Sequence, residues 1–351
     1  MKSPDWGWLA LAVLALVVAP LAFSAHTLTL LLIYAMLALS LGLVWGFGGI
    51  LCFGQAAFYG LGAYAYAVAA VNIGESTLPL LLAMLLPALL AAVLGAMMFY
   101  GRISDVYLGV ITLVVTLIFF KFLNGAAGEA YVIGTARLGG YNGIPGYQTL
   151  NVPGMPDVYI TGTALYAVVA ACLVLAWVLA RLLLASHFGR VCVAIRENEL
   201  RAQLLGYDVR AVKTVLFTLG GALAGLAGAF YASWAEIVTP GLFSLAQSAE
   251  IIIWVIVGGV GTLIGPIVGA ILLAALKVAL GSQQTLNNLV VSGATLVLVV
   301  LLLPGGVLPA LARAARRAWR GEWRARPQPP APTGPDAGAI APKRLRRAHR
   351  G

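Results

Sequence analysis

Charged side chains are scarce in this chain. Only 10% of its 351 residues are charged, whereas 61% are hydrophobic. An average soluble domain carries about 25% charged residues, so this chain cannot cover a surface that faces water. A bilayer core takes about 20 apolar residues per helix, and the sequence contains many runs of that length. We therefore expect an all-α, polytopic transmembrane helix bundle over residues 1–310.

Cysteine and histidine are also few, with three residues of each. Cys52, Cys172 and Cys192 form no CxxC pair, which argues against a disulfide framework or a zinc site. We expect no metal site, no catalytic residue and no bound cofactor. The sequence lacks the GxxxxGK[ST] phosphate loop as well, so we do not expect this chain to hydrolyse ATP itself.

Apolar runs predict the membrane crossings. The candidate spans are 6–24, 27–47, 51–72, 79–100, 107–124, 163–185, 212–232 and 286–303. The stretch 248–280 is too long for one ordinary span, and glycines followed by Pro266 interrupt it, which breaks a helix. We expect a broken pair, 248–260 and 263–280, with a re-entrant segment as the alternative. The total is nine to ten spans.

Basic residues predict the orientation of these spans. Most lie in the loop 186–212 and in the tail 311–351, which holds eleven of them against two acidic residues. By the positive-inside rule both segments and the N-terminus are cytoplasmic, and the loop 125–162 is external. The tail has the composition of a disordered segment that lies against membrane lipid or only sets orientation. Nothing in it points to nucleic acid.

The loop 186–212 carries a helical pattern of its own. Apolar residues recur at near-helical spacing from Val191 to Leu205, with charged residues between them, which predicts one amphipathic helix. Gly206 stands where such a helix ends, and Asp208 precedes the next span. The helix either docks into a groove of a soluble partner or lies on the membrane surface. Its mixed charges favour a protein partner.

Polar residues and glycines in the spans, together with Asn142 of the loop 125–162, are the candidates for lining a pathway through the bundle, because polar groups and irregular backbone are costly at membrane depth. The alternative for the glycines is close helix packing. The candidates are Ser40, Gln55, Asn142, Glu250, Gly258, Gly259 and Gly261.

Several segments resemble the permeases of branched-chain amino acid ABC transporters of the LivM type. In the loop these are Phe188-Gly189-Arg190, the run 194–199 and Leu205-Gly206-Tyr207-Asp208-Val209. Others follow in the right order, and the resemblance covers residues 27–310. They are 39–43, 53–58, 60–64, 139–144, 222–229, 258–262 and 303–306. Many relatives carry His where this chain has Gln55, so a proton-carrying role is not transferred to that position.

The resemblance implies one membrane subunit of an ATP-driven importer in the bacterial inner membrane. Its partners would be a homologous second permease of the LivH type, two cytoplasmic ATPase subunits that use ATP-Mg, and a periplasmic binding protein. The loop helix would couple the chain to the ATPases. The coupling residues would be Arg190, Ile195, Arg196, Glu197, Asn198, Glu199, Gly206 and Asp208.

Three functions stay open at this point. The first is import of branched-chain or related amino acids. The second is import of urea or short amides, because Glu250-Ile251-Ile252-Ile253-Trp254 also resembles permeases for those compounds. The third is a self-contained secondary transporter or membrane enzyme, against which the coupling-type helix and the scarcity of acidic residues within the spans both argue.

Overall fold

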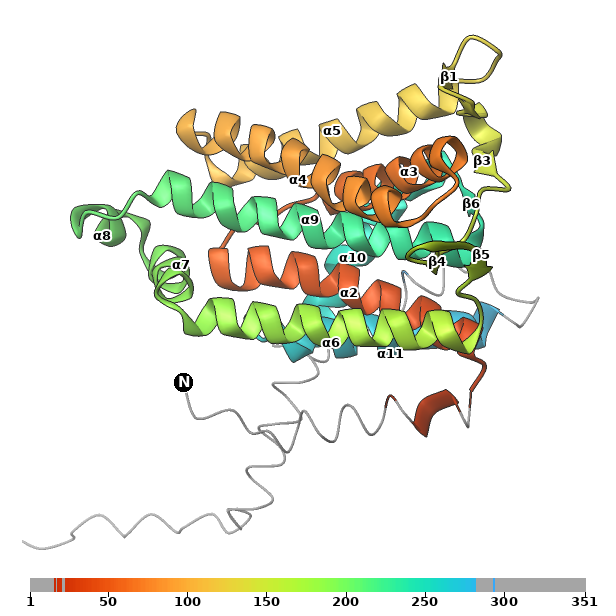
Figure 1. Cartoon of the computed structure of the whole chain (residues 1–351). Helices are drawn as coiled ribbons and strands as arrows, with labels where there is room; N and C mark the ends of the chain where they lie inside the picture. The colour runs from red at the N-terminus through yellow and green to blue at the C-terminus, as the bar shows by residue number, and fades with distance from the viewer. Residues whose placement is uncertain (1–15, 17, 21–22, 282–292, 294–351) are drawn as a thin grey trace, which may run out of the picture. The chain divides into compact units, whose positions relative to one another are not determined.

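The computed structural model describes residues 16, 18–20, 23–281 and 293, and helices dominate this part of the chain (Figure 1). The helices are α2 (Ala25–Gly48), α3 (Gln55–Ile73), α4 (Thr77–Tyr100), α5 (Asp105–Gly125), α6 (Thr163–Ala185), α7 (His187–Glu197), α8 (Glu199–Leu204), α9 (Val209–Ala235), α10 (Leu245–Gly258) and α11 (Ile264–Gly281), with the short 3-10 helices η1 (Gly140–Asn142) and η2 (Pro240–Phe243). Six of the helices in this part are long and apolar enough to cross a membrane, namely α2 to α6 and α9. The prediction of an all-α, polytopic membrane bundle is confirmed.

These six helices coincide with six predicted spans, from 27–47 to 212–232. The predicted spans 6–24 and 286–303 fall almost entirely outside the described residues. The tail 311–351 and the placement of the two termini lie outside them as well.

The long helices alternate in direction between two ends of the bundle, as Figure 1 shows. One end, called here the loop end, carries α7 and α8. The other, called the strand end, carries the segment between α5 and α6. The predicted coupling loop and the predicted external loop therefore lie at opposite ends, as crossing by α6 requires.

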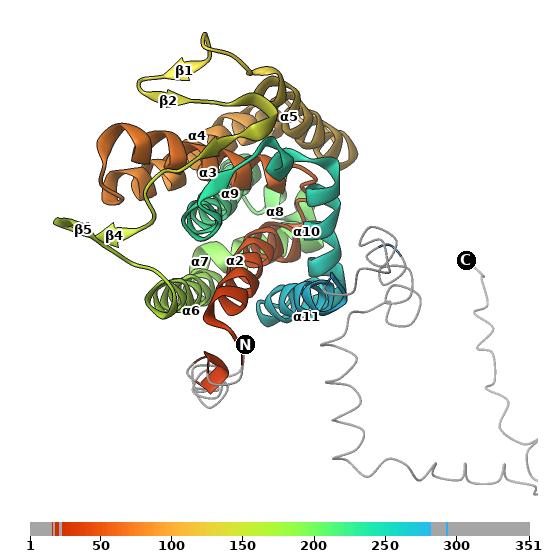
Figure 2. The same cartoon turned by 90° about the vertical axis from the view of Figure 1, so that its right-hand side faces the viewer.

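Six short strands lie at the strand end and pair into three antiparallel two-stranded sheets, β1–β2, β3–β6 and β4–β5 (Figure 2). They are β1 (Val132–Ile133), β2 (Ala136–Arg137), β3 (Ile144–Pro145), β4 (Asn151–Val152), β5 (Met155–Tyr159) and β6 (Ile237–Val238). The β3–β6 pair ties the segment 125–162 to the chain that follows α9. Tyr147 strengthens the tie by donating its hydroxyl to the carbonyl of Ala232 at 2.8 Å. Burial raises the pKa of Tyr147 above its ordinary value, which keeps the phenol protonated as a donor.

Helix α2 lies at the centre of the bundle with most of its side chains buried, whereas most side chains of α4, α5 and α6 are only partly buried or exposed. Small residues let the backbones of the central helices approach closely. A Cβ atom at Gly62 of α3 would collide with the carbonyl oxygen of Gly225 on α9. The exposed apolar stripes of α4 and α5 are the surfaces that face outward from this core.

The stretch 248–280 is broken into α10 and α11, which confirms the predicted split. The two helices form an antiparallel hairpin in which a Cβ at Gly258 would collide with the carbonyl oxygen of Gly265. Between the helices, Gly259 and Gly261 take φ values of 110° and 88°. Residues with a side chain rarely adopt this backbone conformation, so the glycines allow the sharp reversal.

Candidate functional site

The loop between α6 and α9 contains two helices. The prediction of one helix from Val191 to Leu205 is wrong, because α7 ends at Glu197 and α8 starts at Glu199. Asn198 stands between them with extended backbone (φ −161°, ψ 101°). Its side-chain oxygen accepts the N–H of Arg201 at 2.9 Å. Asparagine is a favoured N-cap, so this residue ends one helix and begins the next.

Two further predicted residues shape the end of the loop. Gly206 follows the C-cap of α8 with a φ of 88°, which confirms that the helical segment ends there. Asp208 caps α9, since its carboxylate accepts the N–H groups of Arg210 and Ala211 at 3.1 and 3.2 Å. Both residues position the loop through its own backbone.

The inner face of the loop is apolar. Val191, Ile195, Ala202 and Val209 are buried together and hold α7 and α8 against the start of α9. Cys192 is buried in a neighbouring cluster with Leu43 of α2, and this burial raises the pKa of its thiol to about 11. Ile195 is thus a packing residue of the loop.

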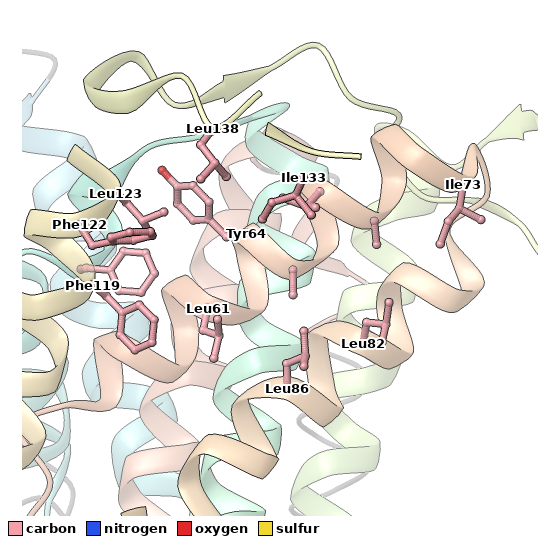
Figure 3. A pocket seen from close by; sticks show the side chains of 14 residues that line it. Leu61, Tyr64, Ile73, Leu82, Leu86, Phe119, Phe122, Leu123, Ile133 and Leu138 are labelled. Carbon is pink, nitrogen blue, oxygen red and sulfur yellow. The ribbon is translucent and has the colours of Figure 1, made fainter. Parts of the chain in front are cut away.

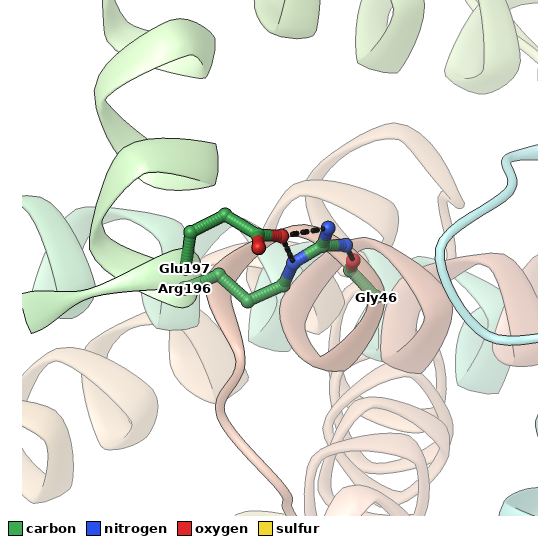
Figure 4. Close-up of polar contacts among 3 residues, drawn as sticks. All are labelled: Gly46, Arg196 and Glu197. Atoms are coloured by element: carbon green, nitrogen blue, oxygen red, sulfur yellow. Dashed lines mark hydrogen bonds and ion pairs between the residues drawn. The ribbon is translucent and has the colours of Figure 1, made fainter. Parts of the chain in front are cut away.

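Arg196 connects the loop to the membrane helices (Figure 4). Its guanidinium donates to the carbonyl oxygen of Gly46 in the last turn of α2 and to the Glu197 carboxylate, the latter from Nη2 at 2.6 Å. The same guanidinium lies beside Gly261, in the turn between α10 and α11. One side chain therefore contacts α2 and the hairpin break at the loop end.

Glu199 forms a second connection. Its carboxylate accepts a hydrogen bond from Lys213 Nζ of α9 at 2.6 Å, and the Lys213 ammonium also lies 5.9 Å from the centre of the Phe99 ring on α4. Lys213 is not among the coupling residues predicted from the sequence. The opposite charges are fourteen positions apart across a turn, so no helical spacing reveals the pair.

The exposed face of α8 and the residue that follows it carry three leucines. Leu200, Leu204 and Leu205 are 65%, 78% and 75% exposed. The helix break at Asn198 resets the helical phase, which turns these leucines away from the buried face that the one-helix prediction implied. Arg190 is exposed as well, and it donates from Nη1 to the carbonyl of Ala185 at 2.9 Å. The loop thus presents an apolar surface, called here the leucine patch (Leu200, Leu204 and Leu205).

Two of the predicted pathway residues are in contact with each other. Gln55 of α3 donates its Nε2 to Ser40 Oγ of α2 at 2.7 Å and to the carbonyl of Gly220 on α9 at 3.3 Å. Ser40 in turn donates to the carbonyl of Leu37 at 2.6 Å. Both side chains are fully buried. They form a hydrogen-bonded node between three central helices.

The remaining pathway candidates lie apart from that node. Asn142 is exposed in η1 at the strand end. Glu250 of α10 forms an ion pair with Lys277 of α11 at 2.9 Å. Gly258, Gly259 and Gly261 belong to the hairpin break near Arg196. The structure therefore does not bring the seven predicted residues together in one cavity of the described chain.

The chain matches over residues 23–300 the protein family described as branched-chain amino acid transport system, permease component. It is 30% identical over 303 residues to the high-affinity branched-chain amino acid transport system permease protein LivM of Escherichia coli, covering 80% of this chain and 69% of that protein. The Salmonella typhimurium LivM is 27% identical, over 82% of this chain and 70% of the relative. The LivH permease of Salmonella typhimurium is 32% identical over 35% of this chain and 40% of its own length. No solved structure matches the chain.

Proposed function

Since the chain belongs to the branched-chain amino acid transport permeases, we propose that it is the LivM-type membrane subunit of an importer for branched-chain amino acids. The match over residues 23–300 carries this proposal. Similarity to both LivM and LivH proteins supports a system with two different permeases, in which a LivH-type chain is the partner. The importer would lie in the inner membrane, and a periplasmic binding protein would deliver the substrate.

The energy would come from two ATPase subunits that bind ATP-Mg and contact the α7–α8 loop. The leucine patch supports this role, because exposed leucines on a short helix fit an apolar groove of a soluble partner. Hydrogen bonds and ion pairs then connect the docked loop to α2 through Arg196 and to α9 through Glu199. Movement of the loop would be passed to these helices as a rigid-body shift.

Co-purification and uptake test the proposal together. The tagged chain, expressed with its genomic neighbours, should bring down an ATPase pair and a second permease. Replacement of residues 190–206 by a flexible linker should release the ATPases and leave the second permease bound. Reconstituted complex with its binding protein should accumulate radiolabelled leucine only when ATP is present inside.

The other functions give different results in the same experiment. Accumulation of urea or acetamide without leucine would replace the proposed cargo and keep the importer. Uptake that proceeds without ATP or ATPase subunits would overturn the importer itself and favour a secondary transporter.

A further inference from the structure

A pocket of about 420 Å³ lies at the strand end between α3, α4 and α5 (Figure 3). Leu61 and Tyr64 of α3, Leu82 and Leu86 of α4, and Phe119 and Phe122 of α5 supply most of its walls. Ile133 and Leu138 of the strand segment cover one side. This pocket shares no residue with the coupling loop or with the pathway candidates.

The lining excludes a free amino acid as the ligand. A site for a small polar molecule needs a few placed polar groups among its apolar walls, and no charged side chain lines this pocket. Tyr64 supplies its one side-chain polar atom. That hydroxyl is shielded and has no hydrogen-bond partner within the described residues. An ammonium or a carboxylate would lose its hydration here without compensation.

The mouth of the pocket joins the exposed apolar surface of α4 and α5. Leu86 and Phe122 are 41% and 57% exposed, and they continue the exposed apolar stripes of α4 and α5. In a membrane, the material that reaches this mouth is hydrocarbon. The walls of an empty apolar cavity lack dispersion contacts. A lipid acyl chain that enters the cavity restores those contacts.

Two cations are next in the chain to residues that line the pocket. Lys121 precedes Phe122 near the end of α5, and Arg137, the last residue of β2, precedes Leu138. Both are exposed, and neither belongs to an ion pair found among the described residues. Basic side chains at the end of a membrane helix suit the phosphate of a lipid headgroup. We propose that this pocket is a phospholipid site, with one acyl chain between α3, α4 and α5 and the phosphate near Lys121 and Arg137.

Photo-crosslinking in the assembled complex tests the site. Benzoylphenylalanine replaces Leu86, which lines the pocket, or Leu85, which is 62% exposed on the same helix but does not line it. After purification and prolonged detergent exchange, mass spectrometry should find a phospholipid adduct at position 86 in at least several-fold excess over position 85. Equal adducts at both positions, detergent alone, or a crosslink to another protein subunit would overturn the proposal.

Different substitutions test the acyl-chain part and the headgroup part of the proposed site. Ala65→Phe fills the pocket and should reduce co-purified phospholipid, whereas Ala88→Phe, at a partly exposed α4 position outside the lining, should not. Lys121→Gln with Arg137→Gln should reduce retention of the lipid at position 86 at least several-fold. Unchanged retention in both the filled and the neutralised variants would contradict the site, and the crosslink at Leu86 remains informative if a filled variant fails to fold.

Discussion

Arg196, on the loop helix α7, donates a hydrogen bond to the main-chain carbonyl of Gly46 in the last turn of α2. The last four carbonyls of a helix lack intrahelical partners and carry its partial negative charge. A guanidinium at this position therefore stabilises the end of α2 and fixes the loop to it. The family resemblance implied Arg196 as a contact to an ATPase subunit, and the structure provides it with a partner inside the chain.

Arg196→Glu should uncouple ATP hydrolysis from uptake. The new carboxylate would face the Gly46 carbonyl, so the loss of a hydrogen bond to a charged group, about 1.5–3 kcal/mol, is followed by repulsion. The ratio of leucine transported to ATP hydrolysed in proteoliposomes is the measurement. Arg102→Glu, at an exposed position between α4 and α5 and outside the coupling loop, is the control for a charge change alone. A normal ratio in Arg196→Glu would show that the Gly46 contact transmits nothing.

Leu204→Asp should weaken the attachment of the ATPases. Complete burial of a leucine stabilises by about 1.5–3 kcal/mol, and a carboxylate in the same groove adds a desolvation cost. When the complex is diluted before the pull-down, the variant should retain less ATPase than the unaltered protein. The second permease should stay bound. Gln203→Asp is the control, because Gln203 is exposed on the same helix and lies outside the leucine patch. Equal loss in both variants would indicate a general effect of charge.

Gln55→Leu distinguishes a packing role from a pathway role. The amide bonds Ser40 and Gly220 in the protein interior, so its removal should lower the stability of the complex by about 0.5–1.5 kcal/mol. Uptake per folded complex should stay close to that of the unaltered protein. Thermal unfolding and uptake at equal protein amounts are measured side by side. Loss of uptake with an unchanged melting temperature would instead place Gln55 in the pathway.

The Glu250–Lys277 pair predicts a charge-reversal rescue. Glu250→Gln leaves Lys277 unpaired, at a cost below the roughly 3–5 kcal/mol of a fully buried pair, because the Lys277 side chain is 41% exposed. Glu250→Lys combined with Lys277→Glu should recover the stability that either of these substitutions removes on its own. Recovered stability without recovered uptake would mean that Glu250 acts on the cargo in addition to pairing.

Cys192 should resist thiol reagents. Burial raises its pKa from near 9 to about 11, so at pH 8 the thiol stays protonated, and the thiolate is the reactive form. Labelling with maleimide is measured in a variant that retains Cys192 and lacks the other two cysteines. Leu204→Cys in a cysteine-free background is the exposed control and should react readily. Fast labelling of Cys192 in the resting complex would show that α7 separates from the cluster in which Cys192 is buried.

Apolar runs and glycine positions were sufficient to predict most of the described fold. A run of about 20 apolar residues has one stable arrangement in lipid, a helix that satisfies its own backbone, so the spans from 27–47 to 212–232 could be located. The break at 248–280 was predictable because several glycines followed by a proline disfavour one continuous helix. The single loop helix was predicted wrongly. Asn198 can either cap a helix or continue one, and periodicity alone does not distinguish the two.

The sequence by itself determined that this protein is a multi-pass membrane protein, where the six described long helices lie and to which family it belongs, because these follow from local hydrophobicity and from motifs within short segments. Only the tertiary structure decided which residues meet. It paired Arg196 with Gly46 and Glu199 with Lys213, placed Gln55 against Ser40 and turned the leucine patch outward. Contacts between residues far apart in the chain depend on how the helices pack, and no spacing within one segment encodes that packing.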